Sequence, residues 1–134
     1  IEHSLAVAES FKTAGVSIPW GSFFAPTKLP ANYFETLSDA GPVHVEFGTE
    51  SLSNSVLQAY RKPFSAGDVA CAHQQALDAG LHVAHYLLLG GPGDSTSTIS
   101  ETLVNIDTLK RTVFFFFIGI RIYPQTTLYD IAMR

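Results

Sequence analysis

The sequence is poor in cysteine, in charged residues and in long apolar runs. Cys71 is the only cysteine among 134 residues, which excludes a disulfide framework and any four-cysteine zinc site or cysteine-held iron–sulfur cluster built from this chain alone. The longest apolar run, Val113–Ile120, is far shorter than the roughly 20 residues of a membrane-spanning helix. No signal-peptide pattern opens the chain. We therefore expect a soluble cytoplasmic protein without a membrane span.

Charge is also scarce and slightly negative. Lys and Arg number 8 against 12 Asp and Glu, giving a formal charge of −4, so an electrostatic nucleic-acid surface is not expected. The chain has instead 46% hydrophobic residues, with ten Phe and five Tyr. That content is too high for a disordered segment, and the length predicts one domain over residues 1–134.

Helix and strand patterns alternate along the chain. Apolar periodicity, glycines, prolines and cap residues predict, in order, helix 1–14, strand 16–24, helix 30–40, strand 43–50, helix 53–60, helix 65–79, strand 81–89, helix 95–109, strand 112–123 and helix 127–134. Strands separated by helices indicate a parallel sheet. A spacing of about 30–35 residues per unit favours an α/β fold, either barrel-like or doubly wound.

Local signals support several of these elements. Pro19 suggests an edge strand or a bulge, and Pro30 suits the first turn of a helix. Ser65 with Asp68 forms a capping-box variant, and Lys110–Arg111 suits the end of a helix. Cys71, among alanines in a helix, is most simply a small core residue.

Alternation along the strands separates an apolar face from a more polar one. The second face is expected to carry His44, Glu46, Gly48, Glu50, His82, Tyr86, Gly90, Val113, Phe115, Phe117, Gly119, Arg121 and Tyr123. Its polar residues concentrate towards the strand C-termini, as expected of a barrel lumen whose working end lies there. A solvated face of an edge sheet is the alternative interpretation.

Two strand-end motifs could bind a ligand. Gly90-Gly-Pro-Gly-Asp-Ser-Thr lets a backbone approach a ligand closely, but it matches neither a Walker loop nor GxGxxG, and a tight turn explains it equally. Glu50 could accept hydrogen bonds from an amine or ribose, and Lys62 could pair with a carboxylate. Taken alone, these two are more simply a first-turn acid and a solvated cation. His82 and His85 lie on opposite faces of a strand, so no metal site is expected.

An ordered set of motifs resembles a known family. These are Glu46-Phe-Gly-Thr-Glu-Ser51, Val56-Leu57, Arg61-Lys62, Leu88-Leu-Gly-Gly-Pro-Gly93 and Gly119-Ile-Arg-Ile-Tyr-Pro124 with Thr126. In this order and spacing they resemble the later part of a radical S-adenosylmethionine (SAM) enzyme, with cobalamin-binding-domain-linked members the most similar. Methylthiotransferases and oxygen-independent coproporphyrinogen oxidases are related. The resemblance runs from about Val16 to the end of the chain.

The resemblance implies strands three to six of a partial (β/α)6 barrel. It implies SAM and a [4Fe-4S] cluster as cofactors of the parent enzyme, with cobalamin on another domain. By the same resemblance Glu50 is a polar SAM ligand, Lys62 reaches the SAM carboxylate, and the backbone at Tyr123 meets the adenine. Gly90, Gly91, Pro92 and Gly93 would lie near the adenosine. Glu46, Tyr86 and Arg121 would face the substrate.

The sequence departs from the family in informative ways. It has no CxxxCxxC cluster motif and no glycine-rich segment for the SAM amino group, while Tyr86 replaces an acid and Asp94 a Glu common in relatives. We therefore expect a fragment of a radical SAM oxidoreductase or transferase, inactive alone, that lacks the cluster-binding part. The open strand edge would favour a homo-oligomer. A non-catalytic nucleotide- or phosphate-binding module and an intact phosphate-binding α/β enzyme are the alternatives.

Overall fold

The fold is built on one parallel sheet. A computed structural model describes all of residues 1–134. The sheet has four strands in the order β1-β2-β3-β4, formed by Trp20–Phe24, Pro42–Glu50, His82–Leu89 and Thr112–Ile118. Every neighbouring pair is parallel, so each connection must cross back over the sheet. The predicted α/β repeats are confirmed.

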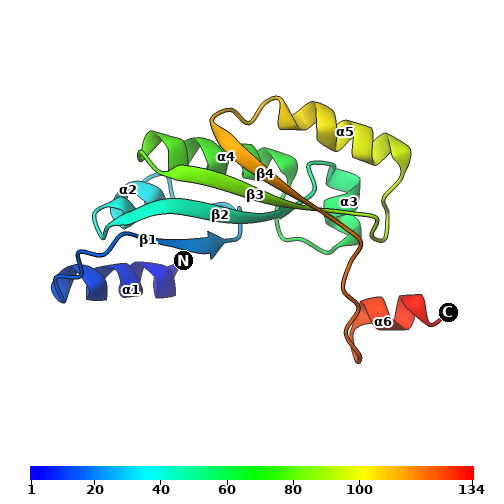
Figure 1. The fold of residues 1–134 in the computed structure, drawn as a ribbon, viewed down its shortest axis with the longest axis horizontal. Helices are drawn as coiled ribbons and strands as arrows, with labels where there is room; N and C mark the ends of the chain where they lie inside the picture. Colours follow the sequence, from blue (N-terminus) through cyan, green and yellow to red (C-terminus); the bar gives the residue numbers. More distant parts are fainter.

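Helices cover one face of this sheet. The helices of the chain are α1 Glu2–Thr13, α2 Tyr33–Ser38, α3 Asn54–Ala59, α4 Ala66–Asp78, α5 Thr96–Ile106 and α6 Thr127–Ala132. The helices α2 and α4 pack together behind β2 and β3, α1 lies beside β1, and α6 lies beyond the end of β4 (Figure 1). A doubly wound sheet would carry helices on both faces, so the one-sided cover favours part of a barrel. No helix combines the length and apolar content needed to span a bilayer.

The main core lies between the sheet and its helices. Phe34 and Leu37 of α2 meet Val45 and Phe47 of β2 there, each 1% exposed or less. A smaller core packs α3, α4 and the segment after α5 together, and it consists of Leu52, Leu57, Phe64, Val69 and Leu109. The predicted Ser65–Asp68 capping box is present, with the Ser65 Oγ accepting from the Asp68 backbone N–H at 3.2 Å. Local sequence thus positions α4 on the core.

Several element ends differ from the prediction. Strand β1 begins at Trp20 rather than residue 16, directly after Pro19 and beside a register shift between Trp20 and Gly21. Helix α2 begins at Tyr33, because Pro30 is instead the first residue of a turn. The Pro30 carbonyl accepts from the Tyr33 N–H at 3.0 Å.

Strand β4 ends at Ile118, not at residue 123. The chain turns at Gly119, whose φ of 88° is left-handed and whose N–H donates to the Leu89 carbonyl at 2.7 Å. Arg121 and Tyr123 therefore lie outside the sheet. Assigning these two side chains to a strand face was wrong.

Two predictions about helix faces also need correction. Cys71 is exposed, because the buried side of α4 is set by Val69, Ala72, His73 and Ala76. Helix α5 ends at Ile106, so Lys110–Arg111 lies past its last turn and makes no dipole interaction there.

Candidate functional site

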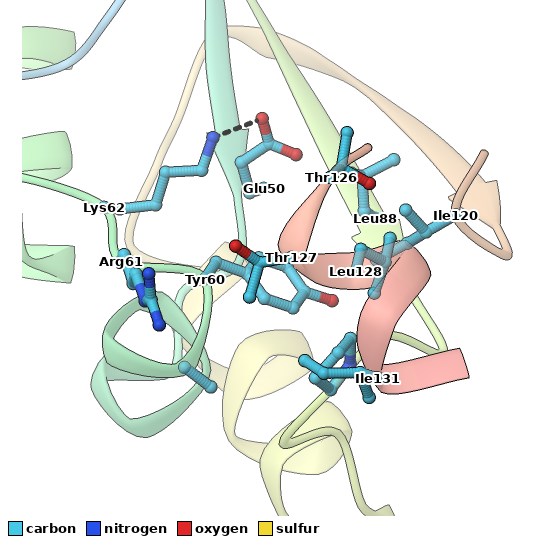
Figure 2. Close-up of a pocket in the computed structure, with 12 residues that line it drawn as sticks. Glu50, Tyr60, Arg61, Lys62, Leu88, Ile120, Thr126, Thr127, Leu128 and Ile131 are labelled. Carbon is cyan, nitrogen blue, oxygen red and sulfur yellow. Dashed lines mark hydrogen bonds and ion pairs between the residues drawn. The ribbon is translucent and has the colours of Figure 1, made fainter. Parts of the chain in front are cut away.

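A cavity of about 400 Å³ opens where β2 and β3 end. Its lining comes from the strand ends, the α3–α4 connection and α6, and consists of Glu50, Ala59, Tyr60, Arg61, Lys62, Leu88, Pro92, Ile120, Thr126, Thr127, Leu128 and Ile131. Figure 2 shows these side chains converging from separate elements, with α6 across one side. The structure thus brings together Glu50, Lys62 and Pro92 of the residues predicted from sequence.

Glu50 and Lys62 form the charged wall of this cavity. The Lys62 Nζ lies 2.8 Å from the Glu50 Oε1, and the side chains are 28% and 20% exposed. Glu50 is the last residue of β2 and has a φ of 64°, a conformation that costs free energy in a non-glycine residue. Such strain is typical of functional sites, and here it places the carboxylate at the cavity.

The end of α3 positions Lys62. Arg61 takes a left-handed φ of 54° directly after the helix, and the Lys62 N–H donates back to the Leu57 carbonyl at 2.9 Å. This is the Schellman arrangement, with Arg61 where glycine is usual. The motif fixes the direction in which the chain leaves α3, so the Lys62 side chain reaches Glu50.

The glycine turn after β3 is closed by its own acid. The Asp94 carboxylate accepts from the N–H groups of Gly90 and Gly91 at 2.7 and 3.2 Å. Gly90 and Gly93 have φ values near 90°, and a side chain at Gly93 would approach the Ala59 Cβ to 2.8 Å. Two of the amides that a phosphate would need are therefore already occupied, which weighs against the phosphate-binding alternatives.

Tyr60 is a cavity residue that the sequence did not reveal. Its hydroxyl is buried, has no hydrogen-bond partner, and occupies the space a Gly91 side chain would need. Burial, reinforced by the charges of Asp94 and Glu50, raises the pKa of Tyr60 to about 12. A neutral hydroxyl thus lies enclosed beside the cavity, between the end of α3 and the Gly90–Gly93 turn. Only the folding of α3 against the Gly90–Gly93 turn creates this contact.

The remaining predicted residues lie elsewhere. Tyr123 is 56% exposed and accepts from the Arg121 Nη1 at 3.1 Å, and neither residue lines the cavity. The Tyr123 carbonyl accepts from the Thr126 Oγ1 at 2.7 Å, which ties the chain to the start of α6. Glu46 and Tyr86 lie on the face of the sheet opposite the helices, as expected of a lumen.

A chain of polar groups also crosses the core behind the site. The Thr49 Oγ1 lies 2.7 Å from the His85 Nδ1, the His85 Nε2 lies 3.0 Å from the His73 Nδ1, and the His73 Nε2 lies 3.0 Å from the Lys110 carbonyl oxygen. Burial lowers the pKa of both histidines, that of His85 to about 3. Both imidazoles are therefore neutral at pH 7, and they anchor the residue preceding Glu50.

Comparison with known proteins places the fold. No protein-family model matches the sequence. A tRNA uridine(34) acetyltransferase of Methanocaldococcus infernus is 30% identical over 103 residues, covering 70% of this chain and 18% of that protein. The radical SAM methyltransferase TsrM of Kitasatospora setae superposes with a TM-score of 0.84 at 17% identity, over 96% of this chain and 27% of TsrM. This is the fold of the radical SAM enzymes.

A second radical SAM enzyme gives the same result. Coproporphyrinogen III oxidase of Escherichia coli superposes with a TM-score of 0.75 at 12% identity, over 89% of this chain and 29% of the oxidase. The predicted resemblance and the predicted partial barrel are both confirmed at the level of the fold. The chain spans less than a third of each radical SAM structure and 18% of the curated relative.

Proposed function

We propose that this chain is part of a radical SAM enzyme, an oxidoreductase or transferase, and that its strand-end cavity contributes to the SAM site. The observation that carries the proposal is the Glu50–Lys62 pair, held at the C-terminal end of β2 by two left-handed residues. Sites on parallel barrels lie at this end of the strands. The fold supports an enzyme as the parent protein.

The cavity's chemistry fits SAM group by group. The SAM carboxylate would pair with Lys62, and either the SAM ammonium or a ribose hydroxyl would donate to Glu50. Each of the two protein side chains would then exchange its present partner for a group of the ligand. Leu88, Pro92 and Ile120 offer an apolar wall for the adenine ring. Tyr123 stays a predicted contact through its backbone.

The cluster does not fit this chain. A [4Fe-4S] cluster that cleaves SAM reductively needs cysteine thiolates, whereas Cys71 is the sole cysteine and is exposed on α4. No three His, Cys, Asp or Glu residues lie close enough together to hold a metal. We therefore assign the cluster to residues outside this chain and derive no step through it. Cobalamin, which is bound in the TsrM structure, would likewise belong to another domain.

We propose that the parent protein is located in the cytoplasm.

A small-ligand-binding module without catalysis is the second candidate. It would use the same cavity, and the exposed position of Cys71 is equally compatible with it. Binding of SAM by a parent protein that also cleaves it would separate the two candidates. Binding without release of 5′-deoxyadenosine, in a parent protein with its cluster loaded, would favour the module.

The proposal is tested by SAM affinity in the full-length protein. Glu50→Ala and Lys62→Ala each remove a charge-assisted hydrogen bond, so each should weaken binding by about 1.5–3 kcal/mol. Lys12→Ala is the matched control, because Lys12 lies on α1 and its 3.8 Å pair with Asp39, at the end of α2, is exposed. Unchanged SAM affinity in both cavity variants would show that the Glu50–Lys62 pair is only structural.

A further inference from the structure

The face of the sheet opposite the helices carries a row of aromatic rings. The ring of Tyr86 lies 5.0 Å from that of Phe115 and 5.9 Å from that of Phe117, at interplanar angles of 23° and 11°. Phe23 of β1 approaches the same ring at 5.1 Å. We call these four residues the aromatic face. Gly48, on the same side of the intervening β2, has no side chain to separate Phe23 from Tyr86.

The aromatic face is open to solvent. Phe23, Phe115 and Phe117 are 65%, 43% and 49% exposed. Aromatic rings normally lie in a core, and a contiguous exposed group of them marks an interaction site. The near-parallel rings of Tyr86, Phe115 and Phe117 suit a flat partner better than a branched one.

One acid stands within this apolar surface. Glu46 is the register partner of Phe23, and its side chain is only 21% exposed. The Glu46 carboxylate also neighbours the Tyr86 hydroxyl, whose pKa it raises. Its one ion-pair partner is the His44 Nε2 at 3.2 Å, and no lysine or arginine pairs with it. Beside the aromatic face there is thus a carboxylate without a permanently cationic partner.

We propose that the aromatic face binds a flat aromatic ring bearing a positively charged nitrogen, with the ring on Tyr86 and Phe117 and the nitrogen at Glu46. The inference rests on the proposed function and on the prediction from the sequence that Glu46 and Tyr86 face the substrate. Stacking and cation–π attraction hold the ring, and the carboxylate selects the charge. A face-to-face second copy fits poorly, because a two-fold axis would bring two Glu46 carboxylates into one apolar contact.

Four probes test the assignment on the wild-type full-length protein at pH 7. They are 2-naphthylmethylammonium, 2-naphthylmethanol, 2-naphthoate and cyclohexylmethylammonium, and their dissociation constants are measured by calorimetry or ligand-observed NMR. We expect the aromatic ammonium to bind about tenfold more tightly than the alcohol, and the naphthoate and the non-aromatic ammonium to bind more weakly than both. Equal affinity for the aromatic ammonium and the naphthoate would overturn the role of Glu46.

Substitutions locate the binding. Glu46→Gln should abolish the preference for the ammonium over the alcohol, and Phe117→Leu should weaken both aromatic probes severalfold. Phe116→Leu is the matched control, because Phe116 is 41% exposed on the opposite face of the same strand. Far-ultraviolet circular dichroism checks that each variant is folded. An equal loss in the Phe116 variant would overturn the location.

Two further results would separate this inference from the proposed function. S-adenosylhomocysteine is titrated in parallel: if it binds and the aromatic ammonium does not, the inference fails while the SAM site stands. If only the aromatic ammonium binds, the proposed SAM site fails instead. A dimer in sedimentation that Phe117→Leu dissociates and Ser22→Lys does not would assign the aromatic face to a second copy and overturn the inference.

Discussion

His73 and His85 share a hydrogen bond in the core, with 3.0 Å between the Nδ1 of His73 and the Nε2 of His85. The tautomers of both histidines follow from the Lys110 carbonyl, at which this series of hydrogen bonds ends. The Lys110 carbonyl can only accept, so the His73 Nε2 carries a hydrogen and its Nδ1 accepts from the His85 Nε2. The His85 Nδ1 must then accept from the Thr49 hydroxyl.

This arrangement predicts a stability that falls in mild acid. The pKa of His85 is about 3 in the folded protein, below its unfolded value of about 6.5. Below pH 6.5 the unfolded chain therefore binds a proton that the folded chain excludes, so the free energy of unfolding should fall by about 1.4 kcal/mol per pH unit. The lowered pKa of His73 acts in the same direction.

Urea unfolding between pH 5 and 6.5 measures this slope before most carboxylates titrate. His85→Leu should flatten it, whatever that variant does to stability at pH 7. His82→Gln, on the exposed side of the same strand, should leave the slope unchanged. A slope as steep in the His85 variant as in the wild type would contradict the buried neutral pair.

The close packing around Gly91 predicts that a larger residue there destabilises the protein. A methyl group there would collide with the Tyr60 hydroxyl and Ile120, so Gly91→Ala should lower the free energy of unfolding by about 1–3 kcal/mol. Adding Tyr60→Phe should recover part of this loss by removing one colliding atom. Gly67→Ala is the control, because the nearest atom to its added Cβ is the Ser65 Oγ at 3.6 Å. Equal effects at Gly91 and Gly67 would contradict the close packing.

The chain alone should bind no iron–sulfur cluster. Three thiolates are needed for a cluster with one open iron, and Cys71 is the only cysteine. Reconstitution with iron and sulfide should give the same absorbance for the wild type and for Cys71→Ala. A stoichiometric cluster, or release of 5′-deoxyadenosine from SAM, would contradict this expectation.

The outer edge of β1 predicts self-association. No strand pairs with this edge, and an unpaired edge is a template for another copy. The driving force is smaller than the sequence implied, since Trp20 packs on Phe11 at 5.6 Å and donates to the Ala40 carbonyl. Edge pairing would extend the sheet and leave the aromatic face open.

Sedimentation equilibrium at micromolar concentration measures this association. We expect a dimer that dissociates when Ser22→Lys places a charge on the edge strand. A 14.5 kDa monomer would show that the β1 edge does not pair.

Local signals predicted much of the fold, and contacts between distant elements explain what they missed. The capping box at Ser65 and Asp68 lies within four residues and was visible in the sequence. The end of β4 was not visible in the sequence, because Gly119 lies inside a continuous apolar run and the turn at Gly119 depends on a hydrogen bond to Leu89. The sequence predicted that Cys71 lies in the core, but it faces outward. The alanines on both sides of it do not indicate which side of the helix is buried.

The residues of the candidate site also fall into those that local sequence patterns predict and those that only the fold brings together. Glu50 and Lys62 follow strand- and helix-end patterns, so the sequence could propose them. Tyr60 carries no such pattern, and its importance arises only where α3 meets the Gly90–Gly93 turn. His73 and His85 likewise become partners through the packing of α4 on β3.

A crystal structure of the full-length protein with S-adenosylhomocysteine would test the central claim most directly. The account predicts that the ligand occupies the strand-end cavity, with its ammonium or ribose at Glu50, its carboxylate at Lys62 and its adenine against Leu88 and Pro92. The 2.8 Å Glu50–Lys62 contact should then lengthen or be shared with the ligand. A ligand bound elsewhere, with this pair intact and the cavity empty, would contradict the account.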